Sequence, residues 1–255
     1  MASLEQLSTV AVPEDAVAIV PTGSTEQHGP ALPLGTDTAI ASALAAAAAE
    51  RREVVVTPAV PVGVSVHHRH FEGTLWVAES TFRDYVGDVL RSLASHGLDR
   101  AVIVNGHGGN VSALGAVARE LKGERTAFAA VWNWWEAIEE AIEAHFDDLG
   151  GHACHVETSL MLAVDEARVR RSRLEAAEAG APPGWGHRVH GADVGHDTID
   201  FTPTGAVGRP TAGNRDDGEA LFAAATDELV AFVDWLADRP AAELFATAAP
   251  TIHRG

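Results

Sequence analysis

Residues 101–110 have the sequence Ala-Val-Ile-Val-Asn-Gly-His-Gly-Gly-Asn, and this stretch changes character halfway along. Its first half is apolar and rich in β-branched residues, which predicts a buried β-strand. Its second half is a glycine-rich turn, and residues 111–122 after it have the apolar spacing of a helix. A short buried strand that leads through a tight turn into a helix is typical of α/β proteins with parallel sheets.

The same order of elements recurs along most of the chain. We expect further strands at residues 16–21, 54–62 and 126–132, and further helices at residues 38–51, 80–96, 155–164 and 217–236. Strands that alternate with helices predict crossover connections and a mostly parallel central sheet covered on both faces. The fold class is therefore α/β, and ligands should bind beyond the carboxyl ends of the strands.

Residues 177–214 do not follow this pattern. The stretch is rich in glycine and proline and contains three histidines together with Trp185. Long loops in compact domains are usually functional or disordered. Its histidine and aromatic content favours a cover over an active site.

Composition limits the class of protein. At 255 residues and 26.7 kDa, with 46% hydrophobic residues, the chain can bury one sizeable core, so we expect residues 1–255 to form a single domain. No apolar run approaches the ~20 residues of a membrane span. Residues 1–6 lack the basic and apolar segments of a signal peptide. We therefore expect a cytoplasmic protein with no membrane partner.

The charge balance argues against nucleic acid as a partner. The 36 acidic and 18 basic residues give a net charge of -18, which would repel a phosphate backbone. Lys122 is the only lysine, and an acidic, lysine-poor, alanine-rich composition is typical of adaptation to high intracellular salt. A halophilic source is therefore one hypothesis, and a GC-rich bacterium is the alternative.

The densest group of ionisable residues lies in Gly-Ser-Thr-Glu-Gln-His-Gly-Pro at 23–30 and Leu-Pro-Leu-Gly-Thr-Asp at 32–37. Glu26 and His28 project to the same side of an extended segment, so they can approach a common centre. An exposed loop pair is the alternative for these two residues. Asp37 precedes an expected helix, where Thr36 or Asp37 could instead serve as the N-cap.

Two further groups flank expected helices. His107 follows the strand at 101–105, and its neighbouring glycines allow close backbone approach, although the histidine of a simple glycine-rich turn could be incidental. His152 and Glu157 can reach one cavity only if His152 precedes a helix that Glu157 begins. Glu157 could instead stabilise the helix N-terminus through its charge. Cys154 is the only cysteine, so any metal must be held by His, Asp and Glu.

Histidines and tryptophans suggest a substrate pocket. His67, His68 and His70 follow an expected strand, and a second metal site is one interpretation of them. We favour substrate contact for His68, with the other two exposed. The tryptophans Trp134 and Trp185, together with those at 132 and 135, could wall a pocket and stack on a flat ring, or fill the core instead.

Taken in order, these motifs resemble the creatininase (creatinine amidohydrolase) superfamily. The resemblance rests on residues 23–37, Phe-Glu-Gly-Thr at 71–74, residues 105–110, and His-Ala-Cys-His-Val-Glu-Thr-Ser at 152–159, and it returns weakly at 205–210. It implies a three-layer α/β/α sandwich that assembles into homohexamers. It also implies two divalent metal ions per subunit, and oxygen and imidazole ligands suit zinc, manganese or iron.

By their positions in these motifs, the resemblance assigns roles to six residues. The metal ligands are Glu26, His28, Asp37, His107 and Glu157, with Asp37 as the bridging carboxylate. His152 is the catalytic residue near the substrate, and we count Glu157 with it. The predicted reaction is hydrolysis of a non-peptide C–N bond, in a small cyclic amide or formamide, by metal-activated water. His152 would deliver a proton to the departing nitrogen.

The chain departs from the creatininase pattern in two places. Creatininases carry a glutamate two residues after the histidine that matches His107, whereas this chain has Gly109, which argues against creatinine itself. The histidine pair at 67–68 and Glu72 also replace Glu-His and proline in the third motif, so the pocket rim should differ.

Other members of the superfamily suggest alternative substrates. They deformylate a formamido-pyrimidine nucleotide in archaeal flavin and deazaflavin synthesis, or trim the mycofactocin precursor peptide. A nucleotide would require cations in the pocket, for which Arg69, Arg188 and Arg209 are the nearby candidates. A non-catalytic metal-binding module that keeps the fold is a remote alternative.

Overall fold

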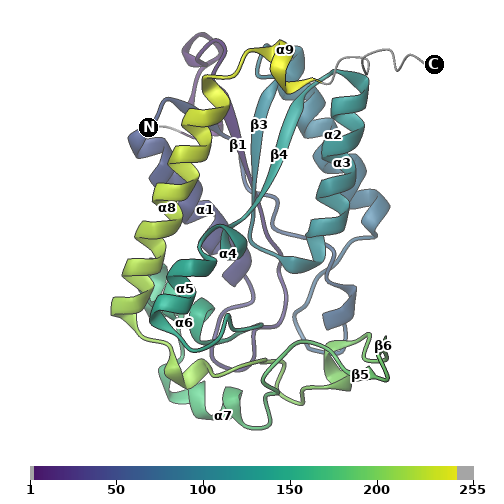
Figure 1. Ribbon diagram of the computed structural model, residues 1–255, viewed down its shortest axis with the longest axis vertical. Coiled ribbons are helices and arrows are strands. Elements are labelled where there is room, and N and C mark those ends of the chain that lie inside the picture. Colours follow the sequence, from purple (N-terminus) through teal and green to yellow (C-terminus); the bar gives the residue numbers. More distant parts are fainter. Residues whose placement is uncertain (1–2, 246–255) are drawn as a thin grey trace, which may run out of the picture.

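The computed structural model describes residues 3–245 and is built on one central sheet (Figure 1). Four parallel strands pair in the order β2-β1-β3-β4. Their bounds are β1 (Val17–Thr22), β2 (Val54–Val56), β3 (Arg100–Asn105) and β4 (Phe128–Asn133). The three longer strands are in register at their carboxyl ends, where Thr22 pairs with Asn105 and Asn105 with Asn133. The loops that follow these strands therefore start from a common edge.

Helices cover both faces of the sheet, so the predicted three-layer α/β/α architecture is confirmed (Figure 1). One face carries α1 (Thr36–Arg51), α6 (His155–Asp165) and α8 (Arg215–Ala237). The other carries α2 (Glu79–Ser95) and α3 (Val111–Glu124). Each side has its own buried apolar cluster because the strands are apolar on both faces.

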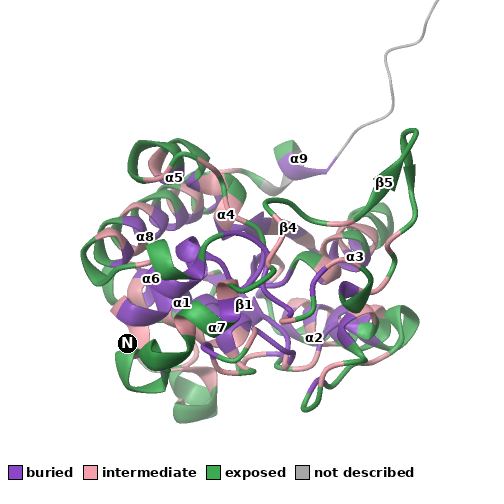
Figure 2. Ribbon diagram, turned by 90° about the horizontal axis from the view of Figure 1, so that it is seen from below, coloured by how far each residue is buried: buried purple, intermediate pink, exposed green. Residues whose placement is uncertain are grey.

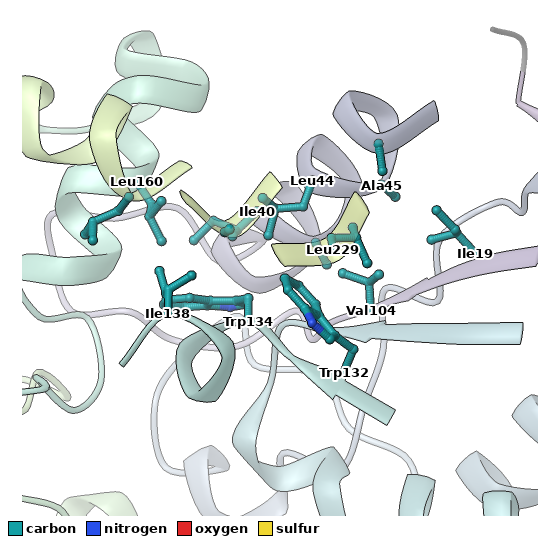
Figure 3. Packing of buried hydrophobic residues seen from close by; sticks show 14 of the residues in the cluster. Ile19, Ile40, Leu44, Ala45, Val104, Trp132, Trp134, Ile138, Leu160 and Leu229 are labelled. Carbon is teal, nitrogen blue, oxygen red and sulfur yellow. The ribbon is translucent and has the colours of Figure 1, made fainter. Parts of the chain in front are cut away.

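The larger cluster lies beneath α1 and α8. Figure 3 shows Ile40 and Leu44 of α1 and Leu229 of α8 packed beside Val104 of β3, with Trp132 of β4 completing the layer. Burying a side chain of this size contributes roughly 1.5–3 kcal/mol. This packing fixes the helix α1, whose first turn carries Asp37, against the sheet.

The expected helices are confirmed to within a few residues at each end, but the strand expected at 54–62 is shorter. It ends at Val56, and only Val60 forms a further bridge, to Thr22. Pro58 and Pro61 lack the N–H groups that a continuous ladder would need.

Short elements occupy the rest of the chain. They are α4 (Trp134–Ala137), α5 (Glu139–His145), α7 (Leu174–Glu178), α9 (Ala241–Leu244) and the antiparallel pair β5 (Arg188–Val189) and β6 (Ala192–Asp193). Residues 177–214, expected as a long loop, consist mainly of this hairpin, two 3-10 turns and connecting loops. Figure 2 shows the hairpin projecting from the body of the molecule. Within residues 3–245, no helix combines the length and apolar character needed to cross a bilayer.

The start of α8 depends on Asn214, whose side-chain oxygen accepts a hydrogen bond of 3.0 Å from the Asp217 N–H. We expect Asn214→Ala to lower the free energy of unfolding by about 1 kcal/mol, measured by urea denaturation. Asn214→Ser restores a capping oxygen and should recover most of the loss. Equal stability of all three proteins would show that the cap contributes nothing.

Candidate metal centre

The predicted ligands come together at the carboxyl edge of the sheet, at the end of the molecule seen in Figure 2. Glu26 and His28 lie in the loop after β1, His107 follows β3, and Asp37 lies in the first turn of α1. All four side chains are buried. An exposed loop pair therefore does not describe Glu26 and His28. The N-cap of α1 is Gly35, so Asp37 does not cap the helix.

Asp37 lies between two histidines. Its Oδ1 is 2.9 Å from His28 Nε2, and its Oδ2 is 3.3 Å from His107 Nδ1. Glu26 Oε2 is 3.1 Å from the same nitrogen of His107. The carboxylate of Asp37 thus faces one imidazole with each oxygen, which is the arrangement required of a bridging ligand.

Glu157 and His152 lie at one cavity, in the arrangement that their spacing in the sequence requires. His152 precedes α6, and Glu157 lies in its first turn with Oε1 at 3.7 Å from His28 Nε2. Ala153 between them has φ 49°, a left-handed conformation that is uncommon for a residue with a side chain. This conformation lets the Ala153 N–H donate to Glu157 Oε2, which holds the carboxylate in place.

Several buried polar atoms at this centre have no hydrogen-bond partner in the described structure. They are both carboxylate oxygens of Glu26, Oδ2 of Asp37, and Nε2 of His28 and of His68. An unpaired buried polar atom costs about 1–3 kcal/mol, and more if it is charged. The carboxylate oxygens of Glu26 and Asp37 in this set converge without donors, and a cation satisfies such an environment, so the centre fits a divalent metal site.

The pKa values in the cluster show the same demand for positive charge. Burial alone would raise the pKa of Glu26, but neighbouring imidazoles, above all His107, hold it well below its usual value. Burial would lower the pKa of His107, yet Glu26 and Asp37 raise it to about 10. For His28, Asp37 and Glu157 likewise outweigh burial and raise the pKa well above normal. The negative charge of these carboxylates must therefore be balanced either by protonation of His28 and His107 or by a metal ion.

The contacts of Nε2, the ring nitrogen that faces away from the carboxylates, set the orientation of the His107 ring. Nε2 lies 3.2 Å from both the Val64 carbonyl oxygen and the Ser65 hydroxyl. When Nε2 carries the ring proton and donates it to these oxygens, Nδ1 has a lone pair that faces Glu26 and Asp37. Asn105 fixes the turn by accepting a hydrogen bond of 3.1 Å from the His107 N–H.

A model of the creatininase family, described as creatinine amidohydrolase, matches residues 2–233. The chain belongs to the creatininase family. A mycofactocin precursor peptide peptidase of Mycobacterium ulcerans is 34% identical over 223 residues, which are 83% of this chain and 82% of that protein. Creatinine amidohydrolase of Pseudomonas putida is 31% identical over 168 residues, which are 59% of this chain and 65% of that protein.

The fold of the family is also found among solved structures. A creatininase of the Zn-Zn type has a TM-score of 0.78 and 24% identity, covering 94% of this chain and 100% of that chain. Family membership confirms the predicted α/β/α fold and the predicted class, a hydrolase. The cluster of His, Asp and Glu agrees with the expectation of a metal-binding protein.

The centre of this creatininase-family chain opens into a cavity of about 660 Å³. Trp134, Trp135, Trp185 and Phe201 give the cavity its aromatic walls. Trp134 is buried and also packs in the core, whereas Trp132 belongs to the core and does not line the cavity (Figure 3). Of the two roles suggested for the tryptophans, lining a pocket and filling the core, Trp132 has only the second and Trp134 has both.

The histidines after β2 occupy three environments. His68 is fully buried, lines the cavity and lies near Glu26, Trp185 and His152. His67 is half-buried and stacks on the His107 ring at 5.7 Å, so the expectation that it is exposed was wrong. His70 is exposed, as expected, and contacts Asp197.

Sequence reasoning gave no role to Gln27, although it lies between Glu26 and His28 in the first motif. Its side chain is buried and contacts His68 and His152. Thr198, which contacts His68, and Phe201 were also missed. A buried amide between two ligand candidates was the available signal for Gln27. Contacts of residues 198 and 201 depend on how a long loop folds back, which no local pattern encodes.

Removal of the His107 imidazole should remove bound metal. We expect His107→Ala to weaken metal affinity by more than the roughly 10–100-fold that loss of a supporting hydrogen bond costs. Zinc content after dialysis, measured by mass spectrometry, checks this. The exposed His96 provides the control, because His96→Ala removes an imidazole far from the centre. Equal metal content in both variants would rule out His107 as a ligand.

Gly109 and Gly108 provide a second matched pair. A Cβ at residue 109 would lie 2.3 Å from the Val64 carbonyl oxygen and 2.4 Å from His107 Nε2, whereas a Cβ at residue 108 would meet nothing within 4 Å. We expect Gly109→Ala to lower the free energy of unfolding by about 1–3 kcal/mol and to reduce metal content. Gly108→Ala should change the stability by less than about 0.5 kcal/mol. Denaturant titrations that rank the pair in the opposite order would contradict the crowding at Gly109.

Proposed function

We propose that this chain is a metal-dependent amidohydrolase whose ligands are Glu26, His28, Asp37, His107 and Glu157. The observation that carries the proposal is the convergence of buried carboxylate oxygens that have no donors with the imidazole nitrogens of His28 and His107. A full set of ligands and a candidate proton carrier argue against the remote alternative of a non-catalytic module.

The geometry supports two divalent ions rather than one. Asp37 presents Oδ1 to His28 and Oδ2 to His107, so two ligand groups form on either side of it. One group contains Glu26 and His107, and the other contains His28 and Glu157. We infer zinc, manganese or iron from the donor set, and among solved creatininases one is named as the Zn-Zn type and another as the Mn form.

Metal ions bound there would supply an acidified water and polarise the substrate carbonyl. The remaining chemistry belongs to the side chains. Hydrolysis adds hydroxyl to the carbonyl carbon, breaks the C–N bond and places a proton on the departing nitrogen. His152 lines the cavity beside the proposed ligands, and burial lowers its pKa, which favours the neutral form that can accept a proton and return it to the nitrogen.

The cavity is suited to an uncharged amide. No Arg or Lys lines it among the residues that the structure describes. The three arginines considered for phosphate binding are paired with acids: Arg69 with Asp197, Arg188 with Asp193 and Arg209 with Asp148. A phosphate held away from the metal centre would find no unpaired Arg or Lys on the described cavity wall, which argues against the nucleotide deformylase alternative.

Two classes of uncharged amide fit this site. The first is a non-peptide amide, cyclic or formamide, whose flat ring would stack on the aromatic walls. The second is a peptide bond. The identity of 34% to a peptidase over about four fifths of both chains favours it, and the cavity of about 660 Å³ has room for either class. A homohexameric assembly and a cytoplasmic location stay predictions.

A substrate panel tests the function. Zinc-loaded protein is incubated with creatinine, a formamido-pyrimidine nucleoside, its 5′-phosphate and short peptides that end in aromatic residues. Creatine, formate and free amino acids are then measured. We expect turnover of at least one uncharged amide that a chelator abolishes and zinc restores. Faster cleavage of the phosphorylated nucleoside than of the free nucleoside would contradict the cavity argument.

A further inference from the structure

The amide of Gln27 is fixed in one orientation. Its Oε1 accepts a hydrogen bond of 2.9 Å from the Gly29 N–H, and its Nε2 donates to the Gly205 carbonyl oxygen at 3.1 Å. Gly205 has φ 85°, and a side chain there would overlap the Gln27 amide. The Nε2 end of Gln27 is therefore the end that faces His68 and His152.

This orientation decides which nitrogen of His68 carries the proton. Gln27 Nε2 lies 2.8 Å from His68 Nδ1, and an amide nitrogen can only donate. Nδ1 must then be the acceptor, and the Thr198 hydroxyl at 2.9 Å can donate to it as well. The proton of neutral His68 is left on Nε2, which points toward Glu26 Oε1 at 3.4 Å and has no hydrogen-bond partner.

His152 is held the opposite way round. Its Nε2 lies 2.8 Å from the main-chain oxygen of Gln27, so this nitrogen donates, and Nδ1 keeps a lone pair. Nδ1 faces the centre, at 3.8 Å from Glu26 Oε1. The two hydrogens of the Gln27 amide are then used by Gly205 and His68. Gln27 Nε2 also lies 3.0 Å from His152 Nε2, and this contact is not a hydrogen bond, because both nitrogens donate elsewhere. Gln27 thus places the N–H of His68 beside the lone pair of His152.

We propose that Gln27 is a positioning residue that fixes these two tautomers, and that the Nε2–H of His68 receives the carbonyl oxygen of the substrate. This inference rests on the proposed amidohydrolase function. Glu26, His68 and His152 are also close enough to hold an ion. The contact with Gln27 argues against that reading for His68, because its inward nitrogen carries a proton and offers no lone pair.

The arrangement suits amide hydrolysis. The carbonyl oxygen gains negative charge as water adds to the carbon, and a fixed N–H that faces it stabilises this charge. The ring centroids of His68 and His152 are 4.6 Å apart, so donor and proton carrier can serve one bond. His68 is fully buried, and burial favours the neutral form of an imidazole. The Nε2–H of His68 makes no hydrogen bond in the free protein, where Glu26 Oε1 lies 3.4 Å away, so it can donate to a substrate oxygen.

Gln27→Glu tests the proposal, because it keeps the shape of the side chain but replaces its donor with a carboxylate. We expect His68 to move its proton to Nδ1, and we expect kcat to fall about 10²–10³-fold while KM and zinc content change little. Solid-state ¹⁵N NMR of zinc-loaded protein labelled at histidine reports the tautomers without any substrate. A His68→Phe spectrum assigns the His68 signals, and this variant should show a similar loss in kcat.

Gln6→Glu is the matched control, since it makes the same change at an exposed residue and keeps the oxygen that accepts from the Ser3 N–H. It should leave the spectrum and kcat unaltered. A wild-type His68 with its proton on Nδ1, or with Nε2 bound to zinc, overturns the inference whether or not any amide is cleaved. Unchanged kcat in both Gln27→Glu and His68→Phe would exclude the donor role. Absence of turnover in wild type alongside the expected tautomers would instead count against the amidohydrolase function.

Discussion

The arrangement of this protein follows from burying Glu26, Asp37 and Glu157 in a space that contains few hydrogen-bond donors. Carboxylates in such a position are tolerated only where positive charge is brought to them. The surrounding imidazoles meet part of this demand, which is why the pKa values of His28 and His107 are raised. The cluster is therefore a poor structural element and a strong cation site, and its stability depends on what occupies it.

The sheet makes this concentration of charge possible. Parallel pairing aligns Thr22, Asn105 and Asn133, so three chain segments leave the sheet side by side. Gly106 lets the turn after β3 approach the first turn of α1, where a side chain would collide with the Asp37 carbonyl oxygen. The core beneath α1 and α8 holds that helix in place (Figure 3). Asp37 and Glu157 are thus placed by the first turns of helices, whereas Glu26, His28 and His107 lie in the loops that leave the aligned strand ends.

Much of this could be predicted from local patterns, because strand, turn and helix signals and the spacing of Glu26, His28 and Asp37 are all short-range. The helices α4 and α5 were missed, although Ile138 and Ile142 have the i, i+4 spacing of a helix. The strand β2 ends early because of Pro58 and Pro61, whereas the prediction considered only the apolar character of residues 54–62. The contacts of Thr198 with His68 and of Trp185 with His67 and His68 could not be predicted, because they join segments more than 100 residues apart.

The cavity has two kinds of wall, and this has a consequence for how the family diversifies. The ligands lie at strand ends and helix starts, whereas Trp185 and Phe201 belong to the irregular segment 177–214. Substitutions in that segment can reshape the space around a substrate while leaving the charge balance of the centre intact. A scaffold divided in this way can acquire new specificities by drift in one region under relaxed constraint. Within this family, one relative is named as a precursor peptide peptidase and another as a creatinine amidohydrolase.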